Sequence, residues 1–547
     1  MYLQASRLAG LAAAVTLPLA PLLAAQQGHE HSGGPLGRVR FPTSCNAAAQ
    51  ARIEPAVAML HSFWYEAALR AFRDVVAADS TCAFGYWGQA MSLWHPLWTP
   101  PPPADLAAGL AAAEQAVRQA SPGSRERDYA EAIAGYYRDY ASVDFKTRMQ
   151  RYEQAMAGVA ARHPDDREAQ IFSALALIAV GYALPDTTLS RQRRAAEMLE
   201  PLFQETPQHP GLAHYLIHAY DFPPLAARGA VAAARYAAIA PAVPHARHMP
   251  SHIYTRLGEW ERSIASNVSA AQAARTFERE QHLNALWDQR GHAMDYLVYA
   301  YLQEGRDREA AALVDTLAGV TAGYPPGSLT NEYALAAIPA RYALERARWA
   351  DAARLTVRPA PEWRATEAIT HFARAIGGAR AGDTALARAA LDSLAAIETA
   401  LARAGGPQLE WSVPVKIQRL AASAWLARAV GDTAGAVAAA MAAADLEDHT
   451  EKHPVTPGPV LPARELLGDL LLELGRPAAA RQAYEASLSR SPNRARSLLG
   501  LARAAEQAGD AATARARYAA LLRLLAHADG DRPELAAARR ATGDAPR

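Results

Sequence analysis

A spacing of 34 residues recurs along this chain of 547 residues and limits its possible folds more than any other feature. Three residues of a C-terminal segment recur 34 residues later: Gly475, Ala480 and Tyr484 are matched by Gly509, Ala514 and Tyr518. A fixed period of this length is typical of proteins built from stacked repeats. Paired amphipathic stretches, separated by Gly-Asp, Gly-Arg or Pro turns, occur almost throughout, and no run of residues reads as a strand. The sequence therefore predicts an all-α array of helix pairs.

One segment carries a fuller repeat signature, with a Leu-Gly pair, a turn glycine, a small residue, an aromatic residue and a closing proline: Leu467, Gly468, Gly475, Ala480, Tyr484 and Pro492. At this spacing the chain resembles the tetratricopeptide repeat (TPR) family. The resemblance implies a right-handed α-solenoid of helix-turn-helix repeats, in which the first helix of each repeat lines a concave groove through positions 2, 5, 9, 12 and 13. The segments 248–253, 295–302 and 453–459 look like those of secreted bacterial TPR proteins of uncharacterised function.

The turns and repeats divide the chain into successive regions. We expect N-terminal TPR-like repeats over 46–120, helical pairs over 121–209, His-rich central TPR repeats over 210–330, degenerate repeats over 331–460 and C-terminal TPR repeats over 461–528. A signal peptide (1–25) and a flexible leader (26–45) precede them, and a loose tail (529–547) follows.

The first 25 residues predict export. Arg7 precedes an apolar stretch from Leu8 to Leu23, and small residues Ala24 and Ala25 follow, as in a secretory signal peptide. An uncleaved anchor is the alternative, although the stretch is short and contains two prolines. Because no later segment could span a bilayer, we expect a periplasmic or extracellular protein with no membrane span in the mature chain.

The only two cysteines, Cys45 and Cys82, lie just ahead of two successive first helices. An oxidising compartment and neighbouring helix starts favour a disulfide, while two separate buried thiols remain the alternative.

The charge balance excludes several classes of function. The formal net charge is +1, with acidic and basic residues interleaved. Binding to nucleic acid needs a concentrated basic stripe, and none is visible, so no nucleic-acid partner is expected. The sequence also has no Gly-rich phosphate loop, nucleophile elbow or zincin motif.

Two His-x-x-x-His pairs, His214/His218 and His248/His252, lie 34 residues apart. Histidines four residues apart share a helix face, so stacked repeats would direct both pairs into the same space. The TPR frame places these residues at groove positions 5 and 9, together with His245 and His292 at position 2 and Asp295 at position 5. Two columns across the repeats are expected: His214, His248 and Asp295, and beside them His218, His252 and Tyr299.

Imidazole is the commonest metal ligand, and this set suits Zn, Cu or Fe. We therefore expect a transition-metal site in the groove, made of His214, His218, His245, His248, His252, His292 and Asp295, with Asp221 and Asp288 as residues that orient an imidazole. An open coordination position would make the site catalytic, and a closed ligand set would make it structural. The alternative is a metal-free scaffold that docks a peptide or an envelope protein in the groove.

Two further groove features are expected. His61 and His95 fall at position 13 of the first two repeats, in an aromatic setting with Trp94 and Trp98 that could receive an apolar ligand. Glu465 and Asp469, at positions 5 and 9, predict an acidic patch near the other end.

Overall fold

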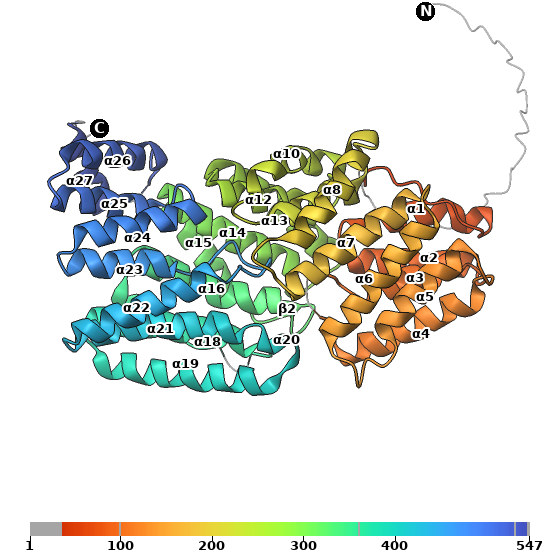
Figure 1. Cartoon of the computed structure of the whole chain (residues 1–547), viewed down its shortest axis with the longest axis horizontal. Helices are drawn as coiled ribbons and strands as arrows, with labels where there is room; N and C mark the ends of the chain where they lie inside the picture. Colours follow the sequence, from red (N-terminus) through yellow and green to blue (C-terminus); the bar gives the residue numbers. More distant parts are fainter. Residues whose placement is uncertain (1–35, 98–99, 359–360, 530–531, 544–547) are drawn as a thin grey trace, which may run out of the picture. The chain divides into compact units, whose positions relative to one another are not determined.

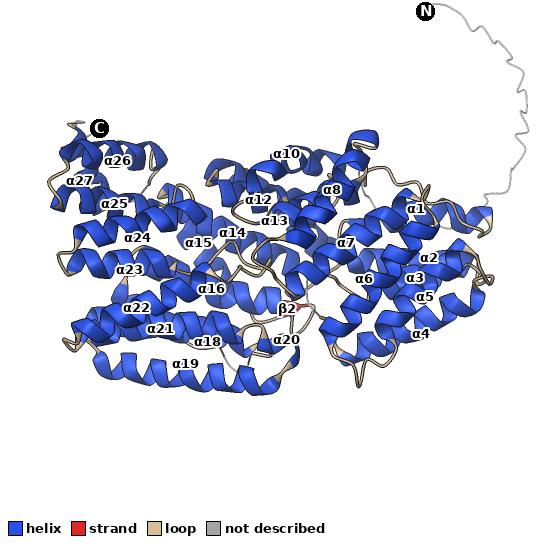
Figure 2. Cartoon of the chain, viewed as in Figure 1, coloured by secondary structure: helices blue, strands red, loops and turns tan. Residues whose placement is uncertain are grey.

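The computed structural model describes residues 36–97, 100–358, 361–529 and 532–543. These residues form antiparallel helix pairs from one end to the other (Figures 1 and 2). The prediction of an all-α solenoid of TPR-like repeats is confirmed. The strands among the described residues are two short ones, β1 (Leu286–Trp287) and β2 (Gly323–Tyr324), which pair in parallel.

The helices of the N-terminal half are α1 (Ala47–His61), α2 (Tyr65–Ala78), α3 (Ala83–Ser92), α4 (Pro103–Gln119), α5 (Arg125–Tyr137), α6 (Phe145–Arg162), α7 (Arg167–Ala183) and α8 (Ser190–Glu205). The central region contains α9 (Pro210–Tyr220), the 3-10 helix η1 (Ala226–Gly229), α10 (Ala230–Ile239), α11 (Pro244–His248), α12 (Pro250–Leu257), α13 (Trp260–Glu280), α14 (Asp288–Glu304) and α15 (Asp307–Ala318).

The degenerate repeats form α16 (Leu329–Glu345), α17 (Trp349–Ala353), α18 (Arg364–Ala381), α19 (Thr384–Ala404), α20 (Gly406–Leu409), α21 (Ser412–Ala429) and α22 (Thr433–Asp448). The C-terminal helices are α23 (Ala463–Glu473), α24 (Pro477–Arg490), α25 (Ala495–Gln507), α26 (Ala511–Leu524) and α27 (Pro533–Thr542).

The turn glycines that anchor the repeat frame end the first helix of their pairs. Gly258, Gly305, Gly475 and Gly509 have φ of 68°, 72°, 67° and 76° and follow α12, α14, α23 and α25. A left-handed residue at this position stops a helix, and glycine adopts it without the steric cost of a Cβ atom. The turns therefore lie where the sequence frame puts them.

The glycine of the Leu-Gly pair makes room for the packing tyrosine. A Cβ atom on Gly468 would lie 2.7 Å from the ring of Tyr484, and one on Gly500 would lie 2.1 Å from it. Tyr484 is fully buried between these glycines. This close contact explains the Gly and aromatic positions of the C-terminal repeat signature.

A disulfide between Cys45 and Cys82 links the chain just ahead of α1 to the chain just ahead of α3.

The described part of the expected flexible leader is packed against the N-terminal repeats. Phe41 is fully buried, and its ring stacks on Trp87 at 5.5 Å between centroids. The leader prediction is therefore wrong for these residues, since burial of Phe41 holds them in place; the predicted signal peptide lies outside the described residues.

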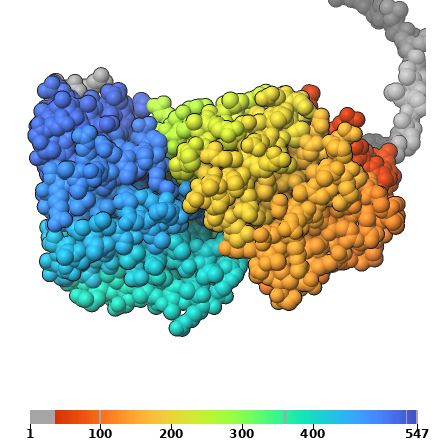
Figure 3. Space-filling view, viewed as in Figure 1, coloured from red at the N-terminus to blue at the C-terminus, as the bar shows by residue number. Residues whose placement is uncertain are grey.

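C-terminal segments pack on central ones although 225 to 233 residues separate the contacts below in sequence. The indole nitrogen of Trp260 donates to the carbonyl oxygen of Asn493 at 2.9 Å, and Arg532 forms an ion pair with Asp307 with Nε and Oδ2 3.0 Å apart. Figure 3 shows the C-terminal residues in blue beside the central residues in green and yellow.

Part of the expected loose tail is ordered. Residues 533–542 form α27, which packs on α26, and Arg532 ahead of it is 6 % exposed. The ion pair with Asp307 fixes the start of this helix, which the sequence reading did not foresee. Within the ranges that the structure describes, no helix combines the length and apolar composition needed to cross a membrane.

Candidate metal centre

The six predicted histidines come together in the interior of the central repeats. His214 and His218 lie on α9, His245 and His248 on α11, His252 on α12 and His292 on α14. Their exposed fractions are between 0 and 3 %. The expectation that they line an open groove is therefore wrong, because other parts of the chain fill that space.

Proline shapes the local backbone around these residues. Pro210 and Pro244 occupy the first turns of α9 and α11, where a missing N–H leaves no hydrogen bond unmade. Pro250 lies four residues after Ala246, so it cannot donate to that carbonyl, and the helix predicted as continuous is divided into α11 and α12. His252 therefore lies on a different helix from His245 and His248.

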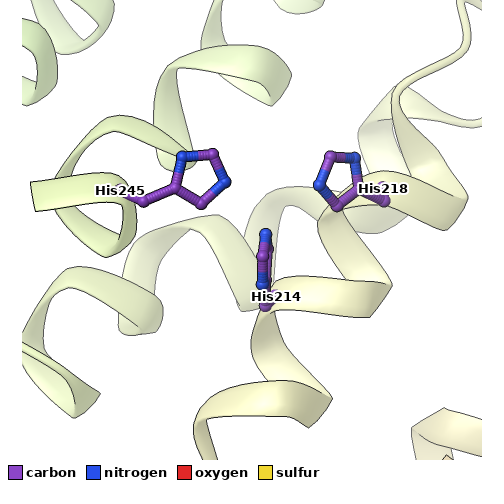
Figure 4. A group of neighbouring side chains, drawn as sticks. All are labelled: His214, His218 and His245. Carbon is purple, nitrogen blue, oxygen red and sulfur yellow. The ribbon is translucent and has the colours of Figure 1, made fainter. Parts of the chain in front are cut away.

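The first triad consists of His214, His218 and His245, which each offer a ring nitrogen within 4.8 Å of the others. Figure 4 shows the three rings facing a common space, two from α9 and one from α11. Phe63 forms an apolar wall beside them, with its ring centroid 4.3 Å from that of His214 and 5.7 Å from that of His218.

The second triad consists of His248, His252 and His292, whose ligand atoms also lie within 4.8 Å of one another. The Nε2 atoms of His248 and His252 are 3.0 Å apart. The ring centroids of His248 and His292 are 4.1 Å apart, against 5.0 Å for those of His248 and His252. The two triads adjoin, because the centroids of His245 and His248 are 5.9 Å apart, as are those of His218 and His252.

Hydrogen bonds fix the tautomer of every ring in the second triad. His252 Nδ1 lies 2.8 Å from a carboxylate oxygen of Asp221, and His292 Nδ1 lies 3.1 Å from the carbonyl oxygen of Val455. His248 Nδ1 lies 2.6 Å from Oδ1 of Asn267, whose amide nitrogen donates to a backbone carbonyl. All three partners are acceptors, so each Nδ1 is the donor, and the lone pair of each neutral ring is on Nε2.

These tautomers leave the contact between His248 and His252 without a proton. Two neutral Nε2 atoms that both carry a lone pair repel each other at 3.0 Å. Protonation would supply a donor, but burial lowers the pKa of His248 well below its usual value and also lowers the pKa of His252. Two nitrogens bound to one zinc-sized ion at tetrahedral angles would be about 3.3 Å apart. The observed separation is near that value.

Asp221 joins the second triad to a distant part of the chain. Its carboxylate accepts from His252 and Lys452, each at 2.8 Å, and from Arg256. Lys452 belongs to the crossing segment, residues 449–462, which also provides the Val455 carbonyl that orients His292. The suggestion that Asp221 orients an imidazole is confirmed, with His252 as its partner.

Asp295 does not join the histidines. Its carboxylate forms a buried ion pair with Arg341, with Oδ1 and Nε 2.8 Å apart. The guanidinium of Arg341 also donates to Thr456, Gly458 and Pro459 of the crossing segment. The structure therefore assigns Asp295 to the anchoring of that segment rather than to a metal.

The predicted columns are also not formed. His214 groups with His218 and His245 rather than with His248 and Asp295, and the hydroxyl oxygen of Tyr299 accepts from Arg494 at 2.9 Å. Asp288 lies at the start of α14, and one of its carboxylate oxygens is 3.4 Å from the hydroxyl of Ser328.

His61 is part of a saturated buried group instead of an aromatic groove. Its Nε2 and the Nε2 of His209 both bind the carboxylate of Glu168, at 2.8 and 2.9 Å, and its Nδ1 lies 2.9 Å from the hydroxyl of Tyr215. These bonds satisfy both His61 nitrogens. The backbone oxygen of His61 accepts from His214 Nδ1 at 2.7 Å, which links the group to the first triad.

The rest of the expected aromatic patch is dispersed. His95 contacts Tyr65, with ring centroids 4.5 Å apart, and Trp94 is 1 % exposed, whereas Trp98 lies outside the described residues. The expected acidic patch is also neutralised, because Glu465 forms ion pairs with Arg494 and Arg496, and Asp469 binds Arg496.

A cavity of about 140 Å³ lies on the crossing segment, next to the partners of Asp221. Arg256, Lys452 and Thr456 line it, together with Glu447. Burial lowers the pKa of Lys452 to about 8 and raises the pKa of Glu447 to about 7.

The sequence did not identify Asn267, Lys452 or the Val455 carbonyl as part of the site. An amide side chain on α13, a lysine and a backbone oxygen belong to no metal-site motif.

No protein-family model matches the chain, and no curated protein matches it. Among solved structures, the human IFIT1 dimer with PPP-AAAA is similar at a TM-score of 0.38 and 12% identity, over 88% of this chain and 92% of that one. The human IFIT1 dimer with m7Gppp-AAAA gives a TM-score of 0.37 and 13% identity, over 89% and 92% of the two chains. Likeness at this level transfers neither a partner nor an activity.

Proposed function

We propose that this protein binds a transition-metal ion through the Nε2 atoms of His248, His252 and His292. One observation carries the proposal: the lone pairs of His248 and His252 face each other at 3.0 Å, while each Nδ1 is committed to an acceptor. A cation between the two nitrogens turns this repulsion into two bonds.

The surroundings of the triad support the same function. Metal-bound histidines generally donate their other N–H to a carboxylate or a carbonyl, which fixes the ring and increases its basicity. The second triad has three such partners, namely Asp221, Asn267 and the carbonyl of Val455. A set of three imidazoles suits Zn, Cu or Fe, and such an ion would supply Lewis-acid or redox chemistry when bound.

We further propose that the protein is exported and binds its metal outside the cytoplasm. The signal-like residues 1–25 and the bond between Cys45 and Cys82 support this location, because disulfides persist mainly in oxidising compartments.

The alternative is a metal-free scaffold that docks a peptide or an envelope protein. This function would need an open groove at the histidine positions. Those positions are buried, and the crossing segment contacts them. The test below decides between the two functions.

Metal retention and metal-dependent stability test the proposal. The purified mature protein is stripped with a chelator, titrated separately with Zn, Cu and Fe(II), and followed by thermal unfolding and by metal analysis after dialysis. His252→Gln removes a ligand of the second triad. His163→Gln is the control, because His163 lies near the surface and pairs with Asp128, away from both triads.

The proposal predicts that wild type and His163→Gln retain metal and unfold at a higher temperature when loaded. A ligand at about 100 times its Kd stabilises the native state by roughly 2.7 kcal/mol. His252→Gln should lose most of the shift that Zn or Fe(II) produces. Equal and negligible shifts in all three proteins would reject the metal site in favour of the docking scaffold.

A further inference from the structure

The first triad contains buried imidazole nitrogens that the site proposed above does not use. Nε2 of His214 and both ring nitrogens of His218 have no hydrogen-bond partner among the described residues. Buried polar atoms are nearly always hydrogen-bonded, and each exception needs an explanation. Three such atoms within two side chains are therefore an observation separate from the second triad.

The orientation of His214 is set in the same way as that of the second-triad rings. Its Nδ1 donates to the carbonyl oxygen of His61, which leaves the lone pair on Nε2. His61 is itself held by Glu168 and Tyr215, so the acceptor is fixed in place. His214 is thus prepared to present Nε2 to a ligand.

Packing alone does not account for these side chains. The surroundings of the three rings are aromatic: Phe63 contacts all three, and Tyr236 stacks on His214. Leu or Phe would fill such a space without burying unpaired nitrogens. Instead, three nitrogen-bearing rings from two helices converge on one point, as Figure 4 shows.

The charge around the first triad indicates which ion it would hold. Its three candidate ligands are neutral, and no carboxylate hydrogen-bonds to His214 or His218. The charges that act on His218 are those of Asp221 and Lys452, which form an ion pair with each other beside the second triad. The cost of burying an ion rises with the square of its charge, so a divalent ion costs about four times as much as a monovalent one.

Coordination number leads to the same choice. Zinc bound by three protein ligands takes a fourth ligand such as water, whereas monovalent copper is stable with three ligands. Copper is compatible with imidazole, and its monovalent form carries the smaller charge.

We propose that His214, His218 and His245 form a second metal site that holds monovalent copper beside the ion of the second triad. The inference rests on the proposed function, because the two sites would form one centre of two ions. The ligand atoms form two separate groups of three, one for each ion.

The test counts Cu(I) ions bound per chain. Stripped mature protein is titrated anaerobically with Cu(I) against a chromogenic Cu(I) chelator, with ascorbate as reductant because it spares the disulfide. The variants are His218→Leu for the first triad, His252→Gln for the second and His163→Gln as the control. His218→Leu breaks no hydrogen bond from its ring, and His218→Phe is a second choice, since its ring can stack on Phe63 in the same way.

The inference predicts two ions bound to wild type and to His163→Gln, and one ion bound to each triad variant. X-ray absorption of His252→Gln should then show copper bound by about three nitrogens. One ion in wild type that survives in His218→Leu would overturn the second site and leave the proposed function standing. Two ions in His218→Leu would also overturn it, and no bound Cu(I) with two bound Zn would overturn the choice of copper. No metal in any protein would reject both proposals.

Discussion

At the scale of single residues, the histidines of the centre are distinguished by the acceptors behind them. His248, His252 and His292 each commit Nδ1 to a fixed acceptor, and the type of acceptor differs at each position. The 34-residue spacing of the His pairs predicted that these side chains meet. Of the acceptors, Asp221 was also expected from the sequence, because it closely follows His218. Asn267 and the Val455 carbonyl could not be predicted in this way, because they lie on α13 and in the crossing segment.

The first residue-scale prediction concerns Asn267. Replacing Asn267 with Leu removes the acceptor that holds the His248 tautomer, so the metal affinity of the second triad should fall about 10–100-fold. Asn267→Asp keeps an oxygen at the same place and should bind metal nearly as tightly as wild type. Competition titrations with a metal indicator measure both affinities. An equal loss of metal affinity in the two variants would show that the affinity does not depend on an acceptor at position 267.

The second residue-scale prediction concerns pH and the apo protein. Burial lowers the pKa of His218 well below its ordinary value of about 6.5, so below that pH the unfolded chain binds a proton that the folded chain does not. Stability is therefore unaffected above that pH and falls as the pH drops through it. Each such histidine contributes a slope of about 1.4 kcal/mol per pH unit.

His218→Leu removes one of these groups, so its unfolding free energy should fall less steeply between pH 6 and pH 5, by roughly that amount per unit. Urea unfolding of both apo proteins at several pH values measures the difference. Parallel pH profiles would mean that His218 becomes protonated in the folded state.

At the scale of elements, the crossing segment is the part of the fold that closes the centre. Arg341 on α16 donates to residues 456, 458 and 459 of the segment and pairs with Asp295 on α14. The sequence reading assigned Asp295 to the metal because its repeat position matched that of the histidines. Repeat position could not reveal that α16 presents an arginine to the same carboxylate.

The element-scale prediction is a double-mutant cycle on this ion pair. Arg341→Met leaves the buried carboxylate of Asp295 without its cation and should destabilise the fold by roughly 3–5 kcal/mol. Adding Asp295→Leu removes the unpaired charge and should restore part of that loss. Chemical unfolding of the four proteins gives the coupling energy, and a simple sum of the two single effects would show that the residues act independently.

At the scale of the whole molecule, segments far apart in sequence enclose the histidines. His61 at the end of α1 orients His214, and Val455 orients His292 from 163 residues away. The 34-residue period predicted helix pairs, turn glycines and packing tyrosines, because these depend on local geometry. It could not predict the contacts of the crossing segment, since a repeat frame relates neighbouring pairs only. The groove was therefore expected to be open, whereas its central positions are buried.

The central claim is that the second triad binds a metal ion, and anomalous X-ray scattering tests it most directly. Crystals of the metal-loaded mature protein are measured above and below the absorption edge of the bound metal. The account predicts an anomalous peak about 2.0–2.1 Å from the Nε2 atoms of His248, His252 and His292. A loaded crystal without a peak at this point, or with its peak away from these three nitrogens, would contradict it.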